Sequence, residues 1–327
     1  MRITRRLALA GLAGLGVRPA RAEIRGKIVV GGDGWLFPSW EDVRRVNPQR
    51  MRRVCELISD VVRSFAGVNI PVAVVMVPTK ARQYPSLLPA DFQSSAEATA
   101  RYGQALTLLR SSGAIVPDMA KVLADAQAGG SDPMFFKTDT HWTARGAEVA
   151  AVELARLVQP VLPAARARNA VSLGGYTVHV HKGDLVQLLP TSDQAGFPQE
   201  RFRLREAAAN SGRTNARGGL LDVDQADIAV VGNSYMMPYF GFPLVLSSAL
   251  SRPVDLSWQT ARVGPYKTLL DFVQGSQFNR SATRLLVWQL NEGSIEAMPD
   301  TPDWWEPTSM MAPEAFLAQL RQALARK

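Results

Sequence analysis

The sequence predicts an α/β protein in which a mostly parallel sheet is covered by helices on both faces. Three short runs are predicted as strands, the first of them apolar throughout as in a strand buried on both faces, and segments with helical periodicity separate them. These runs are residues 71–77, 226–231 and 284–290. The chain has 327 residues, of which 46% are hydrophobic and 20% charged, as in a globular protein of one large or two ordinary domains.

Residues 1–22 have the pattern of an export signal. Arg2, Arg5 and Arg6 precede an apolar run at 7–17, and Ala-Arg-Ala at 20–22 is a small-x-small cleavage site. The alternative is an uncleaved N-terminal anchor. We therefore expect residues 23–327 to form the exported domain, in the periplasm. The Arg5-Arg6 pair makes the twin-arginine route a candidate, although Ala8 stands where Phe is usual.

The charge balance gives little support to nucleic-acid binding. The chain has 37 basic and 29 acidic residues, a formal charge of +8, but five of the arginines lie in 1–22, which leaves 32 against 29, or +3, for the rest. Nucleic-acid binding needs basic residues clustered on one face. A mild positive balance suits an acidic polysaccharide without requiring one.

The single cysteine, Cys55, excludes an intrachain disulfide. It lies on the apolar face of a predicted helix, so we expect a buried apolar side chain and not a reactive thiol. Export without disulfides fits a Gram-negative periplasm and a chain that buries a large core of its own.

The N-terminal part predicts a small sheet, a helix and the first core strand. Residues 27–30 form a strand, and the glycine-rich turn after it leads into a second strand with Trp35 and Phe37 on one face. A helix is expected over 41–66, with Pro48 interrupting it. The strand at 71–77 is followed by a loop in which Lys80 and Arg82 either bind an anionic group or are ordinary surface charges.

The middle of the chain continues the alternation. We expect a helix over 94–110, a short strand over 114–117 and a helix over 118–128. Thr143 is the expected N-cap of a further helix that runs to about residue 158.

Residues 160–225 change in character, with more Pro, Arg, Gly and Asn and no sustained period. We interpret this region as an irregular β-containing insertion in the catalytic domain, with a strand over 176–181. His179 and His181 share a face of that strand, and without a Cys or His cluster nearby we expect an exposed pair and no metal site. After residue 225 the core resumes, with helices expected over 264–275 and 312–326.

Two local patterns carry chemistry. Asp139 precedes His141 by two residues, and in extended chain such side chains point the same way. The strand at 226–231 ends in a tight Gly232-Asn233-Ser234 turn, which exposes a hydroxyl and aims backbone N–H groups at a developing oxyanion. An imidazole activates a serine hydroxyl, and a carboxylate holds that imidazole in the required tautomer. Alone, each pattern is as well explained by an ordinary turn.

Five short motifs occur in an order that spans nearly the whole chain after the export signal. They are Gly34-Trp35-Leu36-Phe37, Pro78-x-Lys80 with Tyr84-Pro85, Asp139-Thr140-His141-Trp142, Gly183-Asp184-Leu185 and Gly232-x-Ser234-Tyr235. In these motifs the chain resembles the periplasmic SGNH-hydrolase-like O-acetyltransferases that acetylate exopolysaccharides, the alginate O-acetylation protein family in particular. In that family the Asp-His pair precedes the serine, as it does here.

The resemblance implies an SGNH-hydrolase-like, flavodoxin-like α/β/α sandwich. It also implies that Ser234 is the nucleophile, His141 the base and Asp139 the orienting acid. We expect the oxyanion and substrate-binding positions to include Asn233, Tyr235, Lys80 and Arg82. No cofactor or metal is implied. Because acetyl-CoA is not expected outside the cytoplasm, the acetyl donor would be a membrane-bound O-acyltransferase partner, and the acceptor a polysaccharide.

Two departures from the family pattern stand out. Trp288-Gln289 occurs where many relatives have Trp-Glu, and the chain ends soon after its last predicted helix, without room for an appended carbohydrate-binding module. Polymer binding would then use the catalytic domain, where Trp258, Trp304 and Trp305 either stack on sugar rings or pack in the core.

The sequence therefore favours an O-acetyltransferase that works through an acetyl-serine intermediate on an exported polysaccharide. A carbohydrate acetylesterase with the same three residues differs only in the acceptor, water in place of a sugar hydroxyl. A non-catalytic polysaccharide-binding scaffold is the third alternative.

Overall fold

The computed structural model describes residues 23–25, 27–130, 132–164, 171–208 and 226–326. The predicted export signal, residues 1–22, lies outside this part of the chain, as do parts of the predicted insertion. Within the described residues, no helix combines the length and the apolar character that a membrane span requires.

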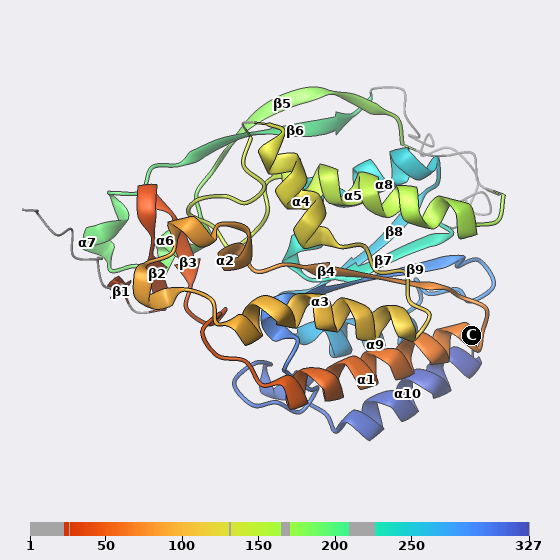
Figure 1. Cartoon of the computed structure of the whole chain (residues 1–327). Coiled ribbons are helices and arrows are strands. Elements are labelled where there is room, and N and C mark those ends of the chain that lie inside the picture. Colours follow the sequence, from red (N-terminus) through yellow and green to blue (C-terminus); the bar gives the residue numbers. More distant parts are fainter. Residues whose placement is uncertain (1–22, 26, 131, 165–170, 209–225, 327) are drawn as a thin grey trace, which may run out of the picture.

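A four-stranded parallel sheet forms the centre of the molecule, as predicted (Figure 1). Its order is β4-β9-β7-β8, and all three neighbouring pairs are parallel. The strands are β4 (Val72–Val77), β7 (Ile228–Gly232), β8 (Val254–Trp258) and β9 (Leu285–Asn291). Since parallel strands end at one edge of a sheet, the segments after β4, β7 and β9 meet there.

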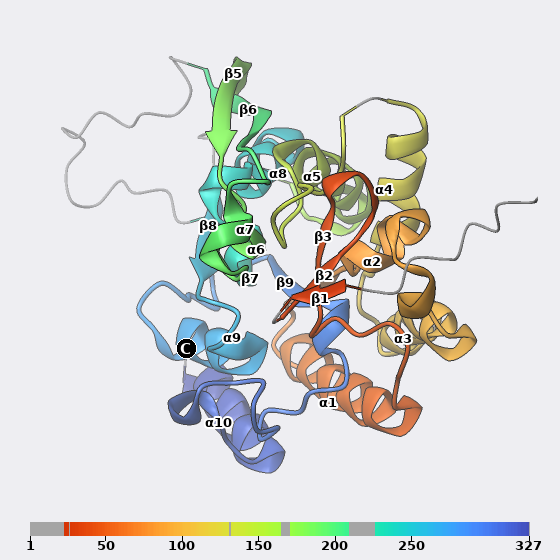
Figure 2. The same ribbon diagram turned by 90° about the vertical axis from the view of Figure 1, so that its left-hand side faces the viewer.

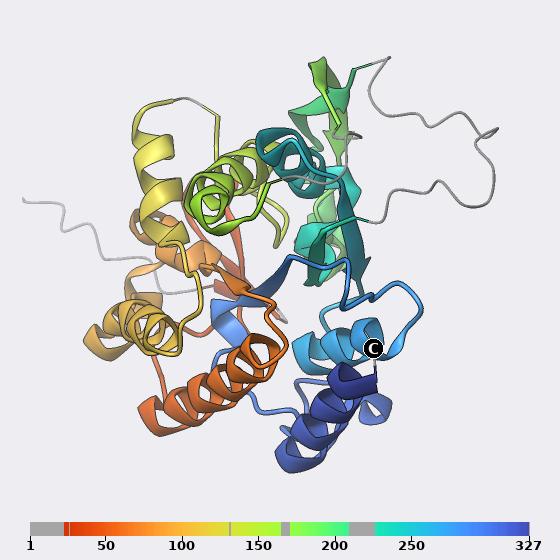
Figure 3. The same cartoon turned by 90° about the vertical axis from the view of Figure 1, so that its right-hand side faces the viewer.

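Helices cover both faces of the sheet, which makes a three-layer α/β/α sandwich (Figures 2 and 3). Alternate residues of β4 enter the two separate cores, because side chains alternate along a strand. One layer consists of α1 (Pro48–Ala66), α3 (Ala96–Ser111), α9 (Gly264–Gln274) and α10 (Pro313–Arg326). The other consists of α4 (Met119–Ala128), α5 (Ala144–Val158) and α8 (Phe242–Leu250).

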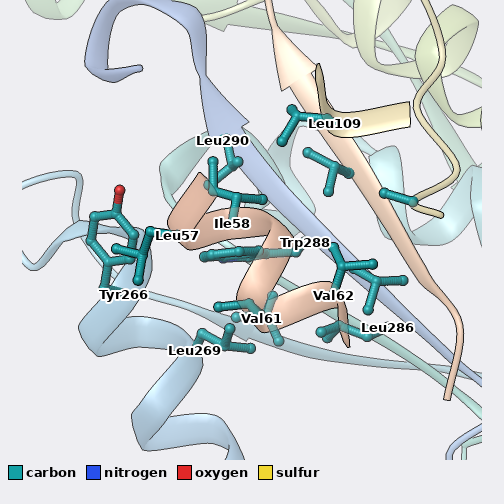
Figure 4. Packing of buried hydrophobic residues seen from close by; sticks show 14 of the residues in the cluster. Leu57, Ile58, Val61, Val62, Leu109, Tyr266, Leu269, Leu286, Trp288 and Leu290 are labelled. Carbon is teal, nitrogen blue, oxygen red and sulfur yellow. The ribbon is translucent and has the colours of Figure 1, made fainter. Parts of the chain in front are cut away.

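Trp288 of β9 lies at the centre of the first core (Figure 4). Ile58 and Val61 of α1 and Leu269 of α9 pack in the same cluster. Each such side chain contributes roughly 1.5–3 kcal/mol through burial. Cys55 is buried in this cluster too, as predicted.

Helix α1 begins later than predicted. The expected helix over 41–66 starts at Pro48, because Asn47 is its N-cap and accepts a hydrogen bond from the N–H of Arg50. Proline is favoured in the first helical turn, where its missing N–H costs nothing. The prediction for Thr143 is confirmed, since its side chain accepts from the N–H of Gly146 at the start of α5.

The strand expected over 114–117 is reduced to a single parallel bridge between Ala73 and Ile115. Pro117 follows at once and has no N–H to extend the pairing. Conversely, α8 and β8 are elements that the periodicity did not reveal. Helix α8 is largely apolar around its whole circumference, so it has no amphipathic period. The side chains of β8 are mostly half-buried and do not alternate between buried and exposed.

Two smaller sheets flank the sandwich. Strands β1 (Glu23–Arg25), β2 (Ile28–Val30) and β3 (Leu36–Pro38) form an antiparallel sheet, with the predicted turn at Gly32–Gly34. Strands β5 (Leu173–His181) and β6 (Glu200–Ala207) form an antiparallel ribbon above α5 and α8 (Figure 1). Helices α6 (Asp184–Gln187) and α7 (Thr191–Gln194) connect β5 to β6.

Candidate active site

Ser234 lies directly beyond the carboxyl end of β7. It begins a single 3-10 turn, Ser234–Met236, and the side-chain oxygen of Asn233 accepts the N–H of Tyr235 at 3.1 Å. Glycine is required at 232, because an added Cβ would lie 2.7 Å from Gln289 Oε1 and 2.8 Å from Met236 Cγ. The close approach of β9 therefore fixes the turn that presents the hydroxyl.

Asp139 and His141 lie on the loop between α4 and α5, which we call the catalytic loop (residues 137–141) because it carries the predicted base and orienting acid. Trp142, fully buried, anchors its end, and the Trp142 Nε1–H donates to the Tyr235 carbonyl at 3.0 Å. The Tyr235 hydroxyl donates in return to the Thr140 carbonyl at 2.7 Å. These two bonds tie the catalytic loop to the turn that carries Ser234.

Ser234, His141 and Asp139 form one hydrogen-bonded chain. Ser234 Oγ lies 2.7 Å from His141 Nε2, and His141 Nδ1 lies 2.7 Å from Asp139 Oδ1. An ionised carboxylate only accepts, so Nδ1 carries the proton and Nε2 of the neutral ring accepts from the serine hydroxyl. This arrangement suits general-base activation of a hydroxyl.

The Asp139 carboxylate accepts four hydrogen bonds. Oδ1 accepts from the Nδ1–H and, at 2.8 Å, the backbone N–H of His141. Oδ2 accepts from His181 Nε2 and from the backbone N–H of Asp184, both at 2.8 Å. Burial alone would raise the pKa of Asp139, but the hydrogen bonds from the two imidazoles outweigh it and hold the pKa well below its usual value.

Lys80 supports the catalytic loop through hydrogen bonds from its ammonium group. Its side chain is fully buried, and its Nζ donates to the carbonyls of Leu36, Lys137 and Asp139 at 2.6, 2.7 and 3.0 Å. All three N–H groups of the ammonium are thus used. Burial lowers the pKa of Lys80 to about 7, while the nearby carboxylates of Glu200 and Asp139 act in the opposite direction.

Two carboxylates, one from β6 and one from α6, also hold the catalytic loop. Glu200 of β6 accepts the N–H groups of Lys137 and Thr138, each at 2.8 Å, and the Thr138 hydroxyl at 2.6 Å. Asp184 of α6 accepts the N–H and the hydroxyl of Thr140, each at 2.7 Å. The region predicted as an insertion therefore supplies direct support for Asp139 and His141.

Arg82 lies in a separate buried ion-pair network. Its guanidinium donates to Glu292 at 2.6 Å, and Arg101 donates to the same carboxylate at 3.2 Å. Burial would raise the pKa of Glu292, but the bond from Arg82 and the charges of both arginines lower it. Glu41 lies beside this network, where burial and the charge of Glu292 raise its pKa to about 8.

The structure separates the predicted binding residues by position. Asn233 lies at the serine, whereas the Tyr235 ring is buried and its hydroxyl is bonded to the catalytic loop. Lys80 and Arg82 are engaged as described above, so the geometry does not support the prediction that they bind an anionic group. Their loop is short because helix α2 (Lys80–Gln83) follows β4 almost directly.

The expectation that His181 is an exposed strand residue is wrong. Only 14% of its side chain is exposed, and the ring faces Asp139. His179, two residues earlier, is 35% exposed and contacts Thr177 and Glu206. Sequence reasoning also missed Asp184 and Glu200, although Asp184 belongs to a quoted motif.

Both the oxygen and the nitrogen of the Gln289 side-chain amide form hydrogen bonds. Its Oε1 accepts the N–H of Asn233 at 2.9 Å, and its Nε2 donates to Asn291 at 2.6 Å. A carboxylate could not make the second bond. Gln289 therefore supports the turn that carries Ser234 and is not an acid of the site.

The three tryptophans considered for sugar stacking differ in exposure. Trp258 ends β8 and is 39% exposed, Trp304 is half-buried, and Trp305 is buried with its Nε1–H donating to Met298. Trp258 pairs in register with Gly232 at the end of β7. Trp258 is therefore the one of the three that combines exposure with proximity to the turn that carries Ser234.

Potential metal ligands occur at the same place. Ligand atoms of Asp139, His141 and Asp184 lie within 4.8 Å of one another. The carboxylate oxygens and imidazole nitrogens concerned all take part in the hydrogen bonds described above.

Comparison with known proteins gives a consistent result. Residues 28–292 match the family model described as "SGNH hydrolase-like domain, acetyltransferase AlgX". The chain is 30% identical over 292 residues to the probable alginate O-acetylase AlgJ of Pseudomonas aeruginosa, an alignment covering 85% of this chain and 73% of the relative.

Among solved structures, the O-acetyltransferase domain of Pseudomonas putida AlgJ superposes with a TM-score of 0.71 at 27% identity, covering 91% of this chain and 100% of that one. Pseudomonas aeruginosa AlgX superposes with a TM-score of 0.59 at 17% identity, covering 84% and 67% of the two chains. At that identity the second likeness concerns the fold alone.

Proposed function

The chain belongs to the family of SGNH-hydrolase-like acetyltransferase domains represented by AlgX, and from that membership we propose that it O-acetylates hydroxyls of an exported polysaccharide through an acetyl-Ser234 intermediate. The observation that carries the proposal is the hydrogen-bonded chain from Ser234 through His141 to Asp139. In the first half-reaction, His141 Nε2 takes the hydroxyl proton while Ser234 Oγ attacks the acetyl carbonyl. The donor's leaving group then departs with that proton, which leaves acetyl-Ser234.

The second half-reaction reverses these roles. A sugar hydroxyl gives its proton to His141 and attacks the acetyl carbonyl, and the proton returns to Ser234 Oγ as the ester bond to the serine breaks. Asp139 keeps the His141 proton on Nδ1 throughout and stabilises the imidazolium that forms in each half.

The oxyanion of each tetrahedral intermediate needs donors beside Ser234. The N–H of Asn233 donates to the side chain of Gln289. The N–H of Tyr235 donates to the side-chain oxygen of Asn233, and the N–H of Met236 donates to the Asn233 carbonyl. Within the described residues, the Ser234 N–H has no acceptor, and the Asn233 carboxamide NH₂ lies on the same turn. We assign these two groups as the oxyanion donors.

The setting follows from the family. The relatives named alginate O-acetylase act on a polysaccharide, which supports a polymeric acceptor for this chain as well. We place the reaction in the periplasm, after export directed by residues 1–22, with a membrane-bound O-acyltransferase as the acetyl source. Trp258 is the candidate sugar-stacking side chain.

Trapping of the intermediate tests this function. Residues 23–327 are mixed with p-nitrophenyl acetate, quenched in acid and weighed intact, beside Ser234→Ala. We expect an increment of about 42 Da on the parent and none on the variant. Equal labelling of both proteins, or none on either together with no ester turnover, would refute the nucleophile assignment.

A further inference from the structure

His181 contacts the far side of the carboxylate that orients the catalytic imidazole. We propose that His181 is a positioning residue for acetyl transfer, which donates from its Nε2 to Asp139 and is held at its Nδ1 by the Tyr239 hydroxyl. The proposal rests on the proposed function of Ser234 and His141. It adds a fourth side chain to the chain of hydrogen bonds and assigns a role to the β5–β6 ribbon.

The hydrogen-bond partners define the tautomer of His181. Its Nε2 lies 2.8 Å from Asp139 Oδ2, and because a carboxylate only accepts, Nε2 must carry a proton. Its Nδ1 lies 3.2 Å from the Tyr239 hydroxyl, which donates when Nδ1 is unprotonated. Both ring nitrogens are thus satisfied in the neutral ring.

Packing holds the ring in this orientation. His181 stacks on Phe136 with ring centroids 4.3 Å apart and meets the edge of Phe202 at 6.2 Å. Phe136 is fully buried, and its neighbour Phe240 stacks on His141 at 5.0 Å. One aromatic cluster therefore positions both imidazoles that flank Asp139.

The contact has a consequence for the chemistry. A donor on Oδ2 withdraws charge from the carboxylate and stops it from rotating away from His141. Without that donor, Asp139 is more basic, holds the His141 imidazolium more strongly and is less well aligned. We therefore expect slower acetylation, and activity that is lost at a higher pH on the acid side.

The groups that titrate around His181 are few. Asp139 approaches from the catalytic loop, Tyr239 from the 3-10 turn Pro238–Phe240, and Asp184 from α6 through its backbone bond to the same carboxylate oxygen. Glu200 of β6 pairs with His181 across the ribbon, and the aromatic neighbours before the catalytic loop and on β6 are Phe136 and Phe202. Because neither leucine nor glutamine titrates at position 181, a change in pH dependence in His181→Leu that is absent from His181→Gln is attributable to loss of the donor to Asp139.

Substitutions at His181 separate positioning from simple packing. His181→Leu removes the donor and keeps an apolar side chain, whereas His181→Gln keeps an N–H group that reaches Asp139. The rate of Ser234 acetylation by p-nitrophenyl acetate is measured from about pH 5 to about pH 9, the range in which histidines titrate. We expect kcat of His181→Leu to fall about 10–100-fold with little change in KM, and the acid limb to move to higher pH.

His181→Gln should recover most of the rate, and Tyr239→Phe should show a smaller loss in the same direction. His179→Gln is the matched control, because it lies on the same strand face without contact to Asp139. Thermal unfolding of each variant reports folding, and if His181→Leu does not fold, His181→Gln and Tyr239→Phe still decide between the outcomes.

Parental rates and pH profiles in His181→Leu would overturn the proposal. A His181→Gln variant that is as slow as His181→Leu would also overturn it. If His181→Leu does not fold, a parental acetylation rate in Tyr239→Phe would overturn it instead. Absence of acetyl-Ser234 in the parent would instead refute the proposed function, and this inference with it.

Discussion

At the scale of residues, the site is defined by a carboxylate whose four acceptor positions are filled. Asp139 receives two imidazole and two backbone donors, so its negative charge is fixed in place and its pKa stays well below the usual range. Because the pKa of folded Asp139 is lowered, its stabilising contribution is present above its unfolded pKa and is lost only in acid below it. We therefore expect Asp139 to be ionised at neutral pH.

Asp139→Asn should lower kcat for acetylation by about 10³–10⁴-fold. The amide cannot accept on both sides, so one imidazole, His141 or His181, faces an N–H group where it needs an acceptor. Stopped-flow acetylation with p-nitrophenyl acetate measures the rate, and circular dichroism confirms folding. A decrease of less than about tenfold would contradict the orienting role.

The raised pKa of Glu41 predicts how the stability of the protein depends on pH. Its pKa is raised from 4.5 to about 8, so protonation favours the folded state. That contribution is complete below about pH 4.5 and is lost as the pH rises towards 8. Glu41→Gln stays neutral and should be more stable than the parent at pH 8 by roughly 1–4 kcal/mol, with little difference at low pH.

Urea unfolding of Glu41→Gln and the parent across this range measures the difference, beside Glu314→Gln on the exposed surface of α10. A difference between Glu41→Gln and the parent that does not depend on pH would show that Glu41 is ionised in the folded protein.

At the scale of elements, the β5–β6 ribbon and α6 are part of the site. They supply His181, Asp184 and Glu200, each of which bonds to the catalytic loop. The sheet positions Ser234, while the ribbon positions Asp139 and His141. We therefore expect acetyl transfer to depend on the docking of β5, β6 and α6 on the catalytic loop.

Gly183 provides the test of this docking. An added Cβ would lie 1.9 Å from the Thr138 carbonyl oxygen, so Gly183→Ala should push α6 from the catalytic loop. We expect the free energy of unfolding to decrease by roughly 1–3 kcal/mol. We expect the acetylation rate to decrease by a larger fraction of its parental value than the free energy of unfolding does.

Gly175→Ala is the matched control, because it lies in β5 with no atom within 4 Å of its added Cβ. If Gly183→Ala and Gly175→Ala behave alike in both measurements, the ribbon is not a support of the loop.

At the scale of the whole molecule, the parallel sheet and its helical layers could be predicted because their signals are local. Strands β4, β7 and β9 are largely apolar runs, and Asp139 and His141 are separated by a single residue, whereas β8 and α8 have no such local signal. The placement of His181 could not be predicted, because it depends on how β5 folds over Asp139, which lies 42 residues earlier in the chain. Burial of Lys80 was missed for the same reason, since its three acceptors come from distant segments.

The central claim is that the acetyl group passes from Ser234 to a sugar hydroxyl. Enzyme acetylated in advance and freed of p-nitrophenyl acetate is mixed with a deacetylated acidic polysaccharide, and the acetyl group is followed by intact mass on the protein and by ester analysis of the polymer. We predict that the adduct of about 42 Da disappears faster with polymer than in buffer, and that the polymer gains the ester. Release of free acetate alone, at the same rate with and without polymer, would contradict transfer.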